Sequence, residues 1–558
     1  MNKLLIFALP AVLLFASGCA IVGINVKHKT PKKAFKYPTF THADTLRGKL
    51  SNYRTCYDVN FYNIDIEVNP DDKFIKGFAD FHFINKTDFD TIQIDLYENM
   101  KINGIICDSD SLRYERIYNA VFVYFNQSQK KDQQTIMTVY YEGNPHPAKR
   151  PPWDGGFVWK KDKSKNPWIG VACELDGASL WWPVKDHLYD EPDSLSMSVT
   201  IPEGLFCVSN GKLINRTKKD NKETFTWKTS YPINTYNATL YIGNYKHFKI
   251  PYSNNESKFD LDFYVLPENL DSAKTHFKQT VDMIKLFEKR FGEYPWQKDG
   301  FKLVESPYAG MEHQSAIAYG NGYKNDKYHK FDYIILHETA HEWWGNSVSA
   351  KDYAEIWLHE GFATYSEALY VEHTKGYDKY LNYLRFYSWL IKNKRPMVGP
   401  FDVNYWDYKD GDVYMKGALV LHTLRNAIAN DTLFFDIIHT FYNDYKYSIA
   451  TSNDFINLVN EKTNSEYNWL FNQYLYDRTC PQLEWNYFYD PTKMKNFVKY
   501  RWTNINSDFP LPIKIEIEGG EEALIHPSKN IQSYEVNTGV WLNTNASYIR
   551  LKRNKKLY

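Results

Sequence analysis

The stretch FDYIILHETAHEWWGNSVSAKDYAEIWLHEGFATYSE, residues 331–367, contains two histidines four positions apart, with a glutamate between them. His337 and His341 lie on one face of a helix, one turn apart, so both imidazoles can reach one metal ion. Glu338 lies about 100° around that helix, where it can act as a general base towards water. Glu360, nineteen residues after His341 on a second predicted helix, can supply the third ligand. Three protein ligands and one open position are typical of catalytic zinc.

Two histidines at this spacing could also lie on a solvated surface helix without binding any metal. The flanking residues argue against that alternative because they are strongly apolar: Ile334, Ile335, Leu336, Trp343 and Trp344. A helix that is apolar nearly all round is buried, and titratable groups inside a buried helix need a partner. A metal ion fits two imidazoles and a carboxylate, so we expect one zinc ion per chain.

Length and composition exclude few classes of protein. The 558 residues are enough for about three domains, and 43% of them are hydrophobic, so the chain can build real cores. Lysine and arginine number 67, as do aspartate and glutamate, which gives no reason to expect a nucleic-acid partner. The 45 Tyr, 34 Phe and 16 Trp residues favour strands and ligand pockets.

The first nineteen residues, MNKLLIFALPAVLLFASGC, have the pattern of a secretory signal. Lys3 precedes an apolar run, residues 4–15, that is too short to span a bilayer. Three small residues before Cys19 resemble a bacterial lipoprotein cleavage box, although Ala16 stands where leucine is usual. A plain signal peptide with an incidental cysteine is the alternative. We expect cleavage, lipidation of Cys19 and a membrane-anchored protein on the periplasmic or surface face of a bacterial envelope. No later stretch has the pattern of a membrane span.

The remaining five cysteines are widely spaced and form no CxxC pair, which argues against cysteine-based metal binding. We expect most of them to be buried free thiols: Cys56, Cys107, Cys173, Cys207 and Cys480.

Hydrophobic periodicity divides the chain after the signal segment into a tether and three domains. Residues 20–45 are basic and without clear periodicity, which is typical of a tether. Residues 46–250 alternate with period two, which predicts an N-terminal β domain of sandwich type. Residues 251–485 show helical spacing and predict a mostly helical domain. Residues 486–558 alternate again and predict a small C-terminal β domain. The clearest alternation is that of Tyr62, Ile64, Ile66 and Val68.

The sequence HETAH at 337–341, followed by Glu360 in LHEGFATYSEA, resembles the M1 zinc aminopeptidases. This gluzincin family includes aminopeptidase N and leukotriene A4 hydrolase. Four other segments are also similar to that family, so the likeness covers about residues 45–485: RTCYDVNFYNIDIEV at 54–68, ACELDGASLWWPVKDH at 172–187, YAGMEHQSAIAYG at 308–320 and VYMKGALVLHTLR at 413–425. The resemblance implies a β-saddle N-domain, a thermolysin-like catalytic domain and a variable C-terminal region.

The resemblance also implies residue roles around the zinc ion. His337, His341 and Glu360 would bind the metal, and Glu338 would be the general base that later passes a proton to the leaving amine. Tyr414 matches the tyrosine that stabilises the tetrahedral oxyanion.

A second group of residues would recognise the substrate. Glu312 matches the acid that holds the free α-ammonium group, and Glu174 aligns with the N-domain residue that shares this task. Ala309, Gly310 and Met311 would pass alongside the substrate backbone. Two acids beyond the zinc would accept an ammonium and reject a blocked N-terminus. Peptides with a free N-terminus are therefore the expected substrates.

Several positions depart from the family pattern. His313 replaces the usual Asn beside Glu312, and we expect it to contribute to the amine pocket and so to the preference for the first residue. His359 replaces a common Asn, and Ser179 stands where many relatives have Arg. About seventy residues follow the catalytic domain in place of a long helical one, so we expect a more open active site.

Three other functions are compatible with parts of this pattern. A zinc endopeptidase would need no amine anchor, so Glu312 and Glu174 argue against it. An epoxide hydrolase activity, as in one family member, is favoured by no residue. A catalytically dead binding protein on the same fold would be expected to lack a zinc ligand, Glu338 or Tyr414, and all of these are present.

Overall fold

A computed structural model describes residues 35–254, 257–405, 410–518 and 520–557. The expected signal segment, most of the expected tether and the predicted lipidation site Cys19 lie outside the described residues. Within the described ranges, no helix combines the length and the apolar character that a bilayer crossing requires.

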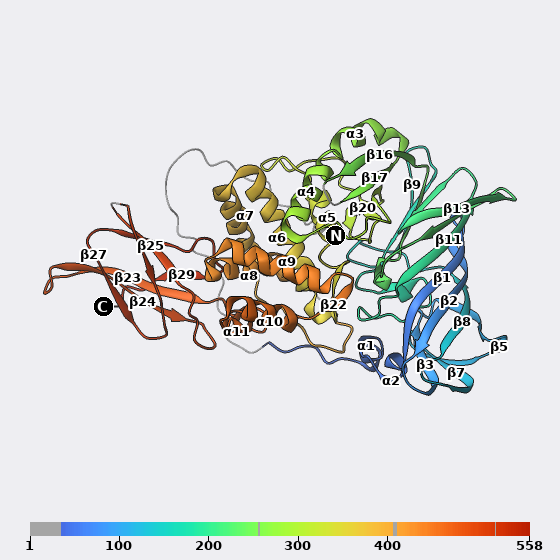
Figure 1. The fold of residues 1–558 in the computed structure, drawn as a ribbon, viewed down its shortest axis with the longest axis horizontal. Coiled ribbons are helices and arrows are strands. Elements are labelled where there is room, and N and C mark those ends of the chain that lie inside the picture. Colours follow the sequence, from blue (N-terminus) through green and yellow to red (C-terminus); the bar gives the residue numbers. More distant parts are fainter. Residues whose placement is uncertain (1–34, 255–256, 406–409, 519, 558) are drawn as a thin grey trace, which may run out of the picture.

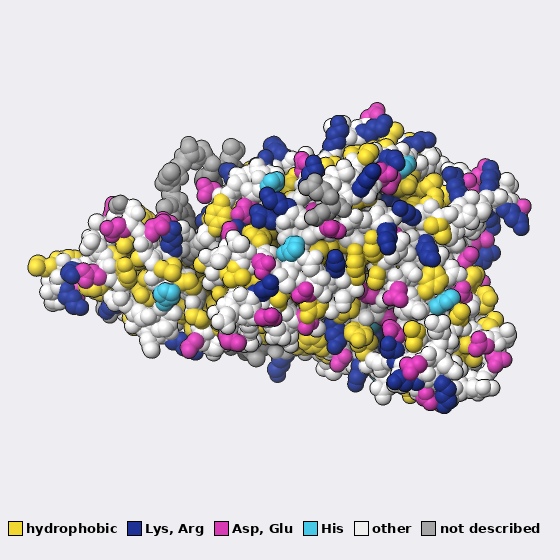
Figure 2. Space-filling view, viewed as in Figure 1, with side chains coloured by type: hydrophobic (Ala, Val, Ile, Leu, Met, Phe, Trp, Pro, Cys, Tyr) yellow, Lys and Arg dark blue, Asp and Glu magenta, His cyan; other side chains and the backbone are white. Residues whose placement is uncertain are grey.

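The chain forms three parts in a row (Figure 1). A β-rich N-terminal domain lies at one end, a mostly helical domain occupies the middle, and a small β domain lies at the other end. This order confirms the fold class expected from the sequence. Figure 2 shows positive and negative side chains interspersed over one face of the molecule, in keeping with the balanced charge.

The N-terminal domain is built on an eight-stranded sheet. Tyr62, Ile64 and Ile66 of its central strand β1 are fully buried, as their alternation predicts. In spatial order the strands are β13 (Lys212–Lys219), β14 (Lys222–Lys228), β11 (Ser194–Pro202), β1 (Tyr57–Asn69), β2 (Phe74–Asn85), β8 (Gln134–Gly143), β4 (Met100–Cys107) and β5 (Asp110–Ser111).

Two smaller sheets and several short helices complete this domain. One sheet contains β3 (Phe89–Asp95), β7 (Ala120–Gln129) and β6 (Arg113–Ile117). The other contains β12 (Phe206–Ser209), β15 (Leu240–Gly243), β10 (Pro167–Ala172) and β9 (Gly156–Lys161). The short helices are α1 (His42–Gly48), α2 (Asn52–Thr55), η1 (Ala178–Leu180) and η2 (Thr235–Asn237).

The middle domain carries the helices that the sequence predicts. Helix α4 ends at Gly292, which occupies the C-cap position with φ 129°, a backbone conformation that favours glycine. The helices are α3 (Leu270–His276), α4 (Gln279–Phe291), α5 (Tyr333–Ala340), α6 (Trp357–Lys375), α7 (Tyr377–Leu390), α8 (Asp412–Ile428), α9 (Asp431–Tyr445), α10 (Ser452–Thr463) and α11 (Asn468–Tyr474), with the short turns η3 (Pro267–Asn269) and η4 (Tyr353–Glu355).

The middle domain also contains a five-stranded sheet that the sequence analysis did not predict. The expected boundary between residues 250 and 251 falls inside β16, which pairs along its length with β17. The strands in order are β16 (Lys246–Ser253), β17 (Lys258–Val265), β18 (Phe301–Glu305), β20 (Ile317–Tyr319) and β19 (Gly310–Met311). A separate pair is formed by β21 (Val348–Ala350) and β22 (Ser448–Ala450).

Helices α6 and α8 cross at two glycines. A Cβ atom added to Gly361 would lie 2.9 Å from the Cα atom of Gly417, and one added to Gly417 would lie 2.6 Å from the Cα atom of Gly361. Both distances are too short for a side chain, so the two helix backbones touch at this point.

The C-terminal domain consists of two small sheets. Its strand β23 begins at Gln482, so the expected boundary between residues 485 and 486 falls inside this strand. One sheet contains β27 (Gln532–Val536), β24 (Lys495–Thr503), β23 (Gln482–Asp490) and β29 (Arg550–Arg553); the other contains β26 (Glu521–Ile525), β25 (Ile513–Ile517) and β28 (Val540–Asn543). The five cysteines among the described residues are free and buried, as expected.

Candidate active site

Helices α5 and α6 bring three potential metal ligands together. Asp332 caps the start of α5 by accepting a hydrogen bond from the backbone N–H of Ile334, at 3.1 Å. The Nε2 atoms of His337 and His341 lie 3.1 Å apart. The Oε2 atom of Glu360, from α6, lies 3.2 Å from the first nitrogen and 3.4 Å from the second. The structure therefore places the three predicted ligands around one point.

The outer ring nitrogens show what these three atoms can bind. The Nδ1 atom of His341 lies 2.8 Å from the carbonyl oxygen of Trp344, which can only accept, so this nitrogen donates. The Nδ1 atom of His337 lies 2.8 Å from Oε1 of Glu367, a carboxylate that also accepts. In a neutral imidazole the proton on Nδ1 leaves a lone pair on Nε2. Two imidazole lone pairs and a carboxylate oxygen therefore face one another, and the donor set fits Zn²⁺.

The same geometry shows that positive charge is stabilised at this point. Burial lowers the pKa of the His337 imidazole, but its contacts with Glu360 and Glu367 outweigh burial and hold the pKa well above its usual value. For the carboxyl of Glu360, burial raises the pKa, but the two histidines hold it below its usual value. A cluster that stabilises protons between its members also suits a divalent cation.

Glu367 is a residue of the site that the sequence analysis missed. It is buried on α6, and its Oε2 atom accepts hydrogen bonds from the hydroxyls of Tyr383 and Tyr387 on α7, each at 2.6 Å. These contacts orient the carboxylate towards His337. The sequence feature that could have identified Glu367 is its position seven residues after Glu360, which puts both acids on one face of a helix.

We expect Glu367→Ala to weaken zinc binding about 10–100-fold, as is typical when the partner that orients a metal-bound imidazole is lost. The dissociation constant measured by competition with a chromogenic chelator is the test. Glu372→Ala is the matched control, because Glu372 lies on the same helix and pairs with Arg425 instead. Unchanged affinity in Glu367→Ala would show that Glu367 does not orient the ligand.

Glu338 lies buried beside the three ligand atoms, and burial, offset in part by the charge of His337, raises the pKa of its carboxyl to about 8. Carboxylate oxygens of Glu338 and Glu312 and a ring nitrogen of His341 all lie within 4.8 Å of one another. Gly310 makes room for this arrangement, since a Cβ atom at this position would lie 2.4 Å from Oε1 of Glu338.

Glu312 connects the site to the N-terminal domain. The hydroxyl of Tyr236, on η2, donates to Oε1 of Glu312 at 3.2 Å. The side-chain amide of Asn346 donates to the backbone carbonyl of Glu312 at 2.6 Å. Burial raises the pKa of the Glu312 carboxyl, and the charge of His341 opposes that effect. The contacts fix Glu312 close to Glu338, outside the group of the three candidate metal ligands.

Glu174 and Tyr414 reach the same region from different domains. Glu174 follows β10 of the N-terminal domain and is buried. The ring of Tyr414, on α8, lies 6.0 Å from the ring of His337, measured between centroids. Burial, and then the charges of Glu360 and Glu174, raise the pKa of the Tyr414 hydroxyl well above its usual value. The hydroxyl therefore stays protonated and can donate a hydrogen bond.

The observed hydrogen-bond partner of His313 lies in the N-terminal domain. Its ring is fully buried, and its Nδ1 atom lies 2.6 Å from the hydroxyl of Tyr241 on β15. Burial lowers the pKa of this imidazole to about 3, so the ring is neutral. The observed partner of His313 thus belongs to the N-terminal domain and not to the carboxylate group around Glu312.

The other residues singled out in the sequence have structural contacts. Met311 is buried on β19 opposite Ala318, and the carbonyl of Ala309 accepts from the N–H of Gly320 at 2.8 Å. Two departures from the family pattern also have internal partners: His359 accepts from the N–H of Ala350 at 2.8 Å, and the Ser179 hydroxyl donates to Asp186 at 2.5 Å.

Residues 275–474, which include the three candidate ligands, match the model of the Peptidase family M1 domain. This part of the chain belongs to peptidase family M1. The M1 domain and its neighbours are similar to "Probable aminopeptidase 1" of Sulfurisphaera tokodaii, with 22% identity over 80% of this chain and 57% of that protein. Aminopeptidase N of Streptomyces lividans is 24% identical over 49% of this chain and 34% of its own length. The chain thus spans about a third to just over half of these relatives.

The fold of the chain also matches solved structures. The M1 zinc metallopeptidase from Deinococcus radiodurans aligns with a TM-score of 0.65 and 19% identity over 76% of this chain and 94% of that one. A mutant of that enzyme bound to a Tyr-Ser-Ala substrate aligns equally well, with 20% identity. These likenesses show that this chain shares the M1 metallopeptidase fold.

Proposed function

We propose that this protein is a zinc aminopeptidase, which removes the N-terminal residue from peptides with a free amino terminus. The observation that supports this function best is the carboxylate of Glu312 within 4.8 Å of Glu338, beside the three potential zinc ligands. A buried anion at that position provides what a hydrolytic centre needs to recognise a substrate ammonium. The aminopeptidase relatives support the same reading.

In this proposal His337, His341 and Glu360 hold the zinc ion. Zinc, when bound, lowers the pKa of a water molecule towards about 7 and polarises the scissile carbonyl. Glu338 accepts the proton of the attacking water and delivers it to the leaving amine. Tyr414 donates a hydrogen bond to the carbonyl oxygen as negative charge develops there.

Glu312 and Glu174 bind the α-ammonium group and so place the first peptide bond at the metal. A charge-assisted hydrogen bond to each acid would contribute roughly 1.5–3 kcal/mol, part of which orients the substrate. A blocked N-terminus would leave these buried carboxylates without a cationic partner, and the pocket would reject it.

The test is the ratio of kcat/KM for a free peptide to kcat/KM for its N-acetylated form. We expect the ratio to be large in the wild type, and chelation to abolish cleavage. Glu312→Ala should raise KM and lower kcat together for the free peptide, and thereby reduce the ratio by about 10-fold or more. Glu293→Ala, which removes an exposed acid outside the site, is the control. If the wild type cleaves both forms equally, an endopeptidase is the better description.

We also propose that the protein is anchored to a bacterial envelope membrane through lipidated Cys19. The support is the sequence LLFASGC and the basic segment that follows it. Cys19→Ser should release the protein from membranes or block its maturation, as judged by fractionation and the mass of the mature N-terminus. A wild-type protein that is found only in the soluble fraction would favour a plain signal peptide.

A further inference from the structure

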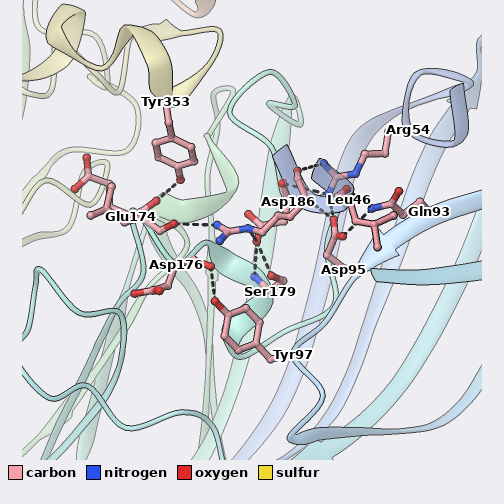
Figure 3. A network of polar contacts seen from close by, with 12 residues as sticks. Leu46, Arg54, Gln93, Asp95, Tyr97, Glu174, Asp176, Ser179, Asp186 and Tyr353 are labelled. Carbon is pink, nitrogen blue, oxygen red and sulfur yellow. Dashed lines mark hydrogen bonds and ion pairs between the residues drawn. The ribbon is translucent and has the colours of Figure 1, made fainter. Parts of the chain in front are cut away.

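Three successive carbonyl groups in the loop that carries Glu174 are each held by a side-chain donor (Figure 3). The hydroxyl of Tyr353 donates to the carbonyl of Glu174. The Nη2 atom of Arg47 donates to the carbonyl of Leu175 at 3.1 Å, and the hydroxyl of Tyr97 donates to the carbonyl of Asp176 at 3.0 Å. Loops usually have few such restraints. In this loop, hydrogen bonds from side chains hold the backbone of residues 174–176 at each residue.

Arg47 is itself held by a buried ion pair. Its Nε atom lies 3.3 Å from Oδ2 of Asp186, and both side chains are largely shielded from solvent, with 9% and 4% exposure. The N–H and hydroxyl of Ser179 donate to the same carboxylate oxygen. Gly177, with φ 81°, leaves the necessary space, since a Cβ atom there would lie 2.1 Å from both Arg47 Nη2 and Asp186 Oδ2. The loop sequence therefore accommodates the guanidinium.

Arg47 reaches the loop from α1 of the N-terminal domain, and α1 is in turn hydrogen-bonded to the middle domain. Thr41 and Asp44 form a capping box that starts α1, and Arg47 lies in the last turn of this helix. The carbonyl of Asp44 accepts from the N–H of Asn404 at 3.1 Å. Tyr353, the donor at Glu174, also belongs to the middle domain, on η4. The Glu174 loop is thus tied to the middle domain by two routes.

We propose that Arg47 is a positioning residue that sets the place of the Glu174 carboxylate relative to the zinc ligands, and so contributes to recognition of the substrate ammonium. This inference rests on the proposed aminopeptidase function. Arg47 acts through the backbone of residues 174–176 and not by contact with substrate. Because Glu174 comes from the N-terminal domain and the metal ligands from the middle domain, their relative position depends on such ties. A displacement of about 1 Å can cost up to 10²-fold in rate.

Two variants test the two ties. Arg47→Lys keeps a cation beside Asp186 but loses the fork geometry that reaches the Leu175 carbonyl, and Tyr353→Phe removes one hydroxyl. Each should lower kcat/KM for a free peptide about 10-fold, with KM raised and kcat lowered, and leave zinc content unchanged. Tyr442→Phe is the matched control, since this buried tyrosine donates to the carbonyl of Glu293, away from the site. We expect wild-type kinetics from the control.

Combination with Glu174→Ala separates a positioning role from a general structural role. If Arg47 and Tyr353 act through the side chain of Glu174, their effects on kcat/KM should largely vanish in the Glu174→Ala background, so the double variants should resemble Glu174→Ala alone. Effects that add in full, or no loss in either single variant, would overturn the inference. The wild-type ratio of free to N-acetylated peptide tests the proposed function separately: a large ratio with additive effects would reject only the role of Arg47.

Discussion

Glu338→Gln is expected to lower kcat by about 10³–10⁴-fold while one zinc ion remains bound per chain. The amide has nearly the size and shape of the carboxyl group but cannot accept the proton of the attacking water. Glu338 contributes none of the three atoms that surround the proposed metal position, so the substitution leaves these three atoms in place. Single-turnover hydrolysis of a free peptide, measured on protein whose zinc content has been determined, gives both quantities.

The control for this experiment is Glu372→Gln, the same chemical change on α6 at a residue that pairs with Arg425. It should keep both zinc and activity. Loss of zinc in Glu338→Gln would mean that this residue supports the metal and that its catalytic role had been assigned wrongly. Near-normal turnover with zinc retained would exclude Glu338 as the general base.

Tyr414→Phe should lower kcat about 10²–10³-fold with little change in KM, as for the loss of one donor to a developing oxyanion. Burial and the nearby acids keep this hydroxyl protonated. The ring that packs beside His337 is kept in the variant, so the fold and the metal site should be unaffected. Steady-state kinetics and zinc analysis on the same preparation test the prediction.

Tyr474→Phe provides the comparison, because Tyr474 is buried and donates to the carbonyl of Tyr548, in the C-terminal domain. Normal turnover in Tyr414→Phe would show that another group stabilises the oxyanion. An equal loss in both variants would point to an effect on folding instead.

The sequence was most informative where function depends on local geometry. The spacing of His337 and His341 within one helix fixes their relation, and the structure brings their ring nitrogens within 3.1 Å. Strand β1 was predictable for a similar reason. One of its faces is buried, so apolar and polar residues alternate along its sequence. By contrast, all five residues of β18 are buried, so this strand shows no alternation, and the central sheet was missed.

The parts that could not be predicted depend on contacts between distant segments. The carboxylate of Glu367 is oriented by hydrogen bonds from two tyrosines on α7. Nothing in the sequence around Glu367 indicates these contacts with a different helix. His313 was expected at the amine pocket because it follows Glu312 directly. Residues adjacent in a strand or turn can face different neighbours, and Tyr241 of the N-terminal domain became its partner.

The contact between Gly361 and Gly417 has a consequence for engineering this protein. Replacing a helical glycine with alanine is a standard route to greater stability, worth up to about 1 kcal/mol. Here Gly361 follows the proposed metal ligand Glu360 in the chain, and Gly417 lies one turn after Tyr414. An added methyl group at either position would meet a backbone atom of the other helix at less than 3 Å. A stabilisation campaign that scored these helices by propensity alone would therefore separate the proposed zinc ligand Glu360 from the tyrosine proposed to act beside it.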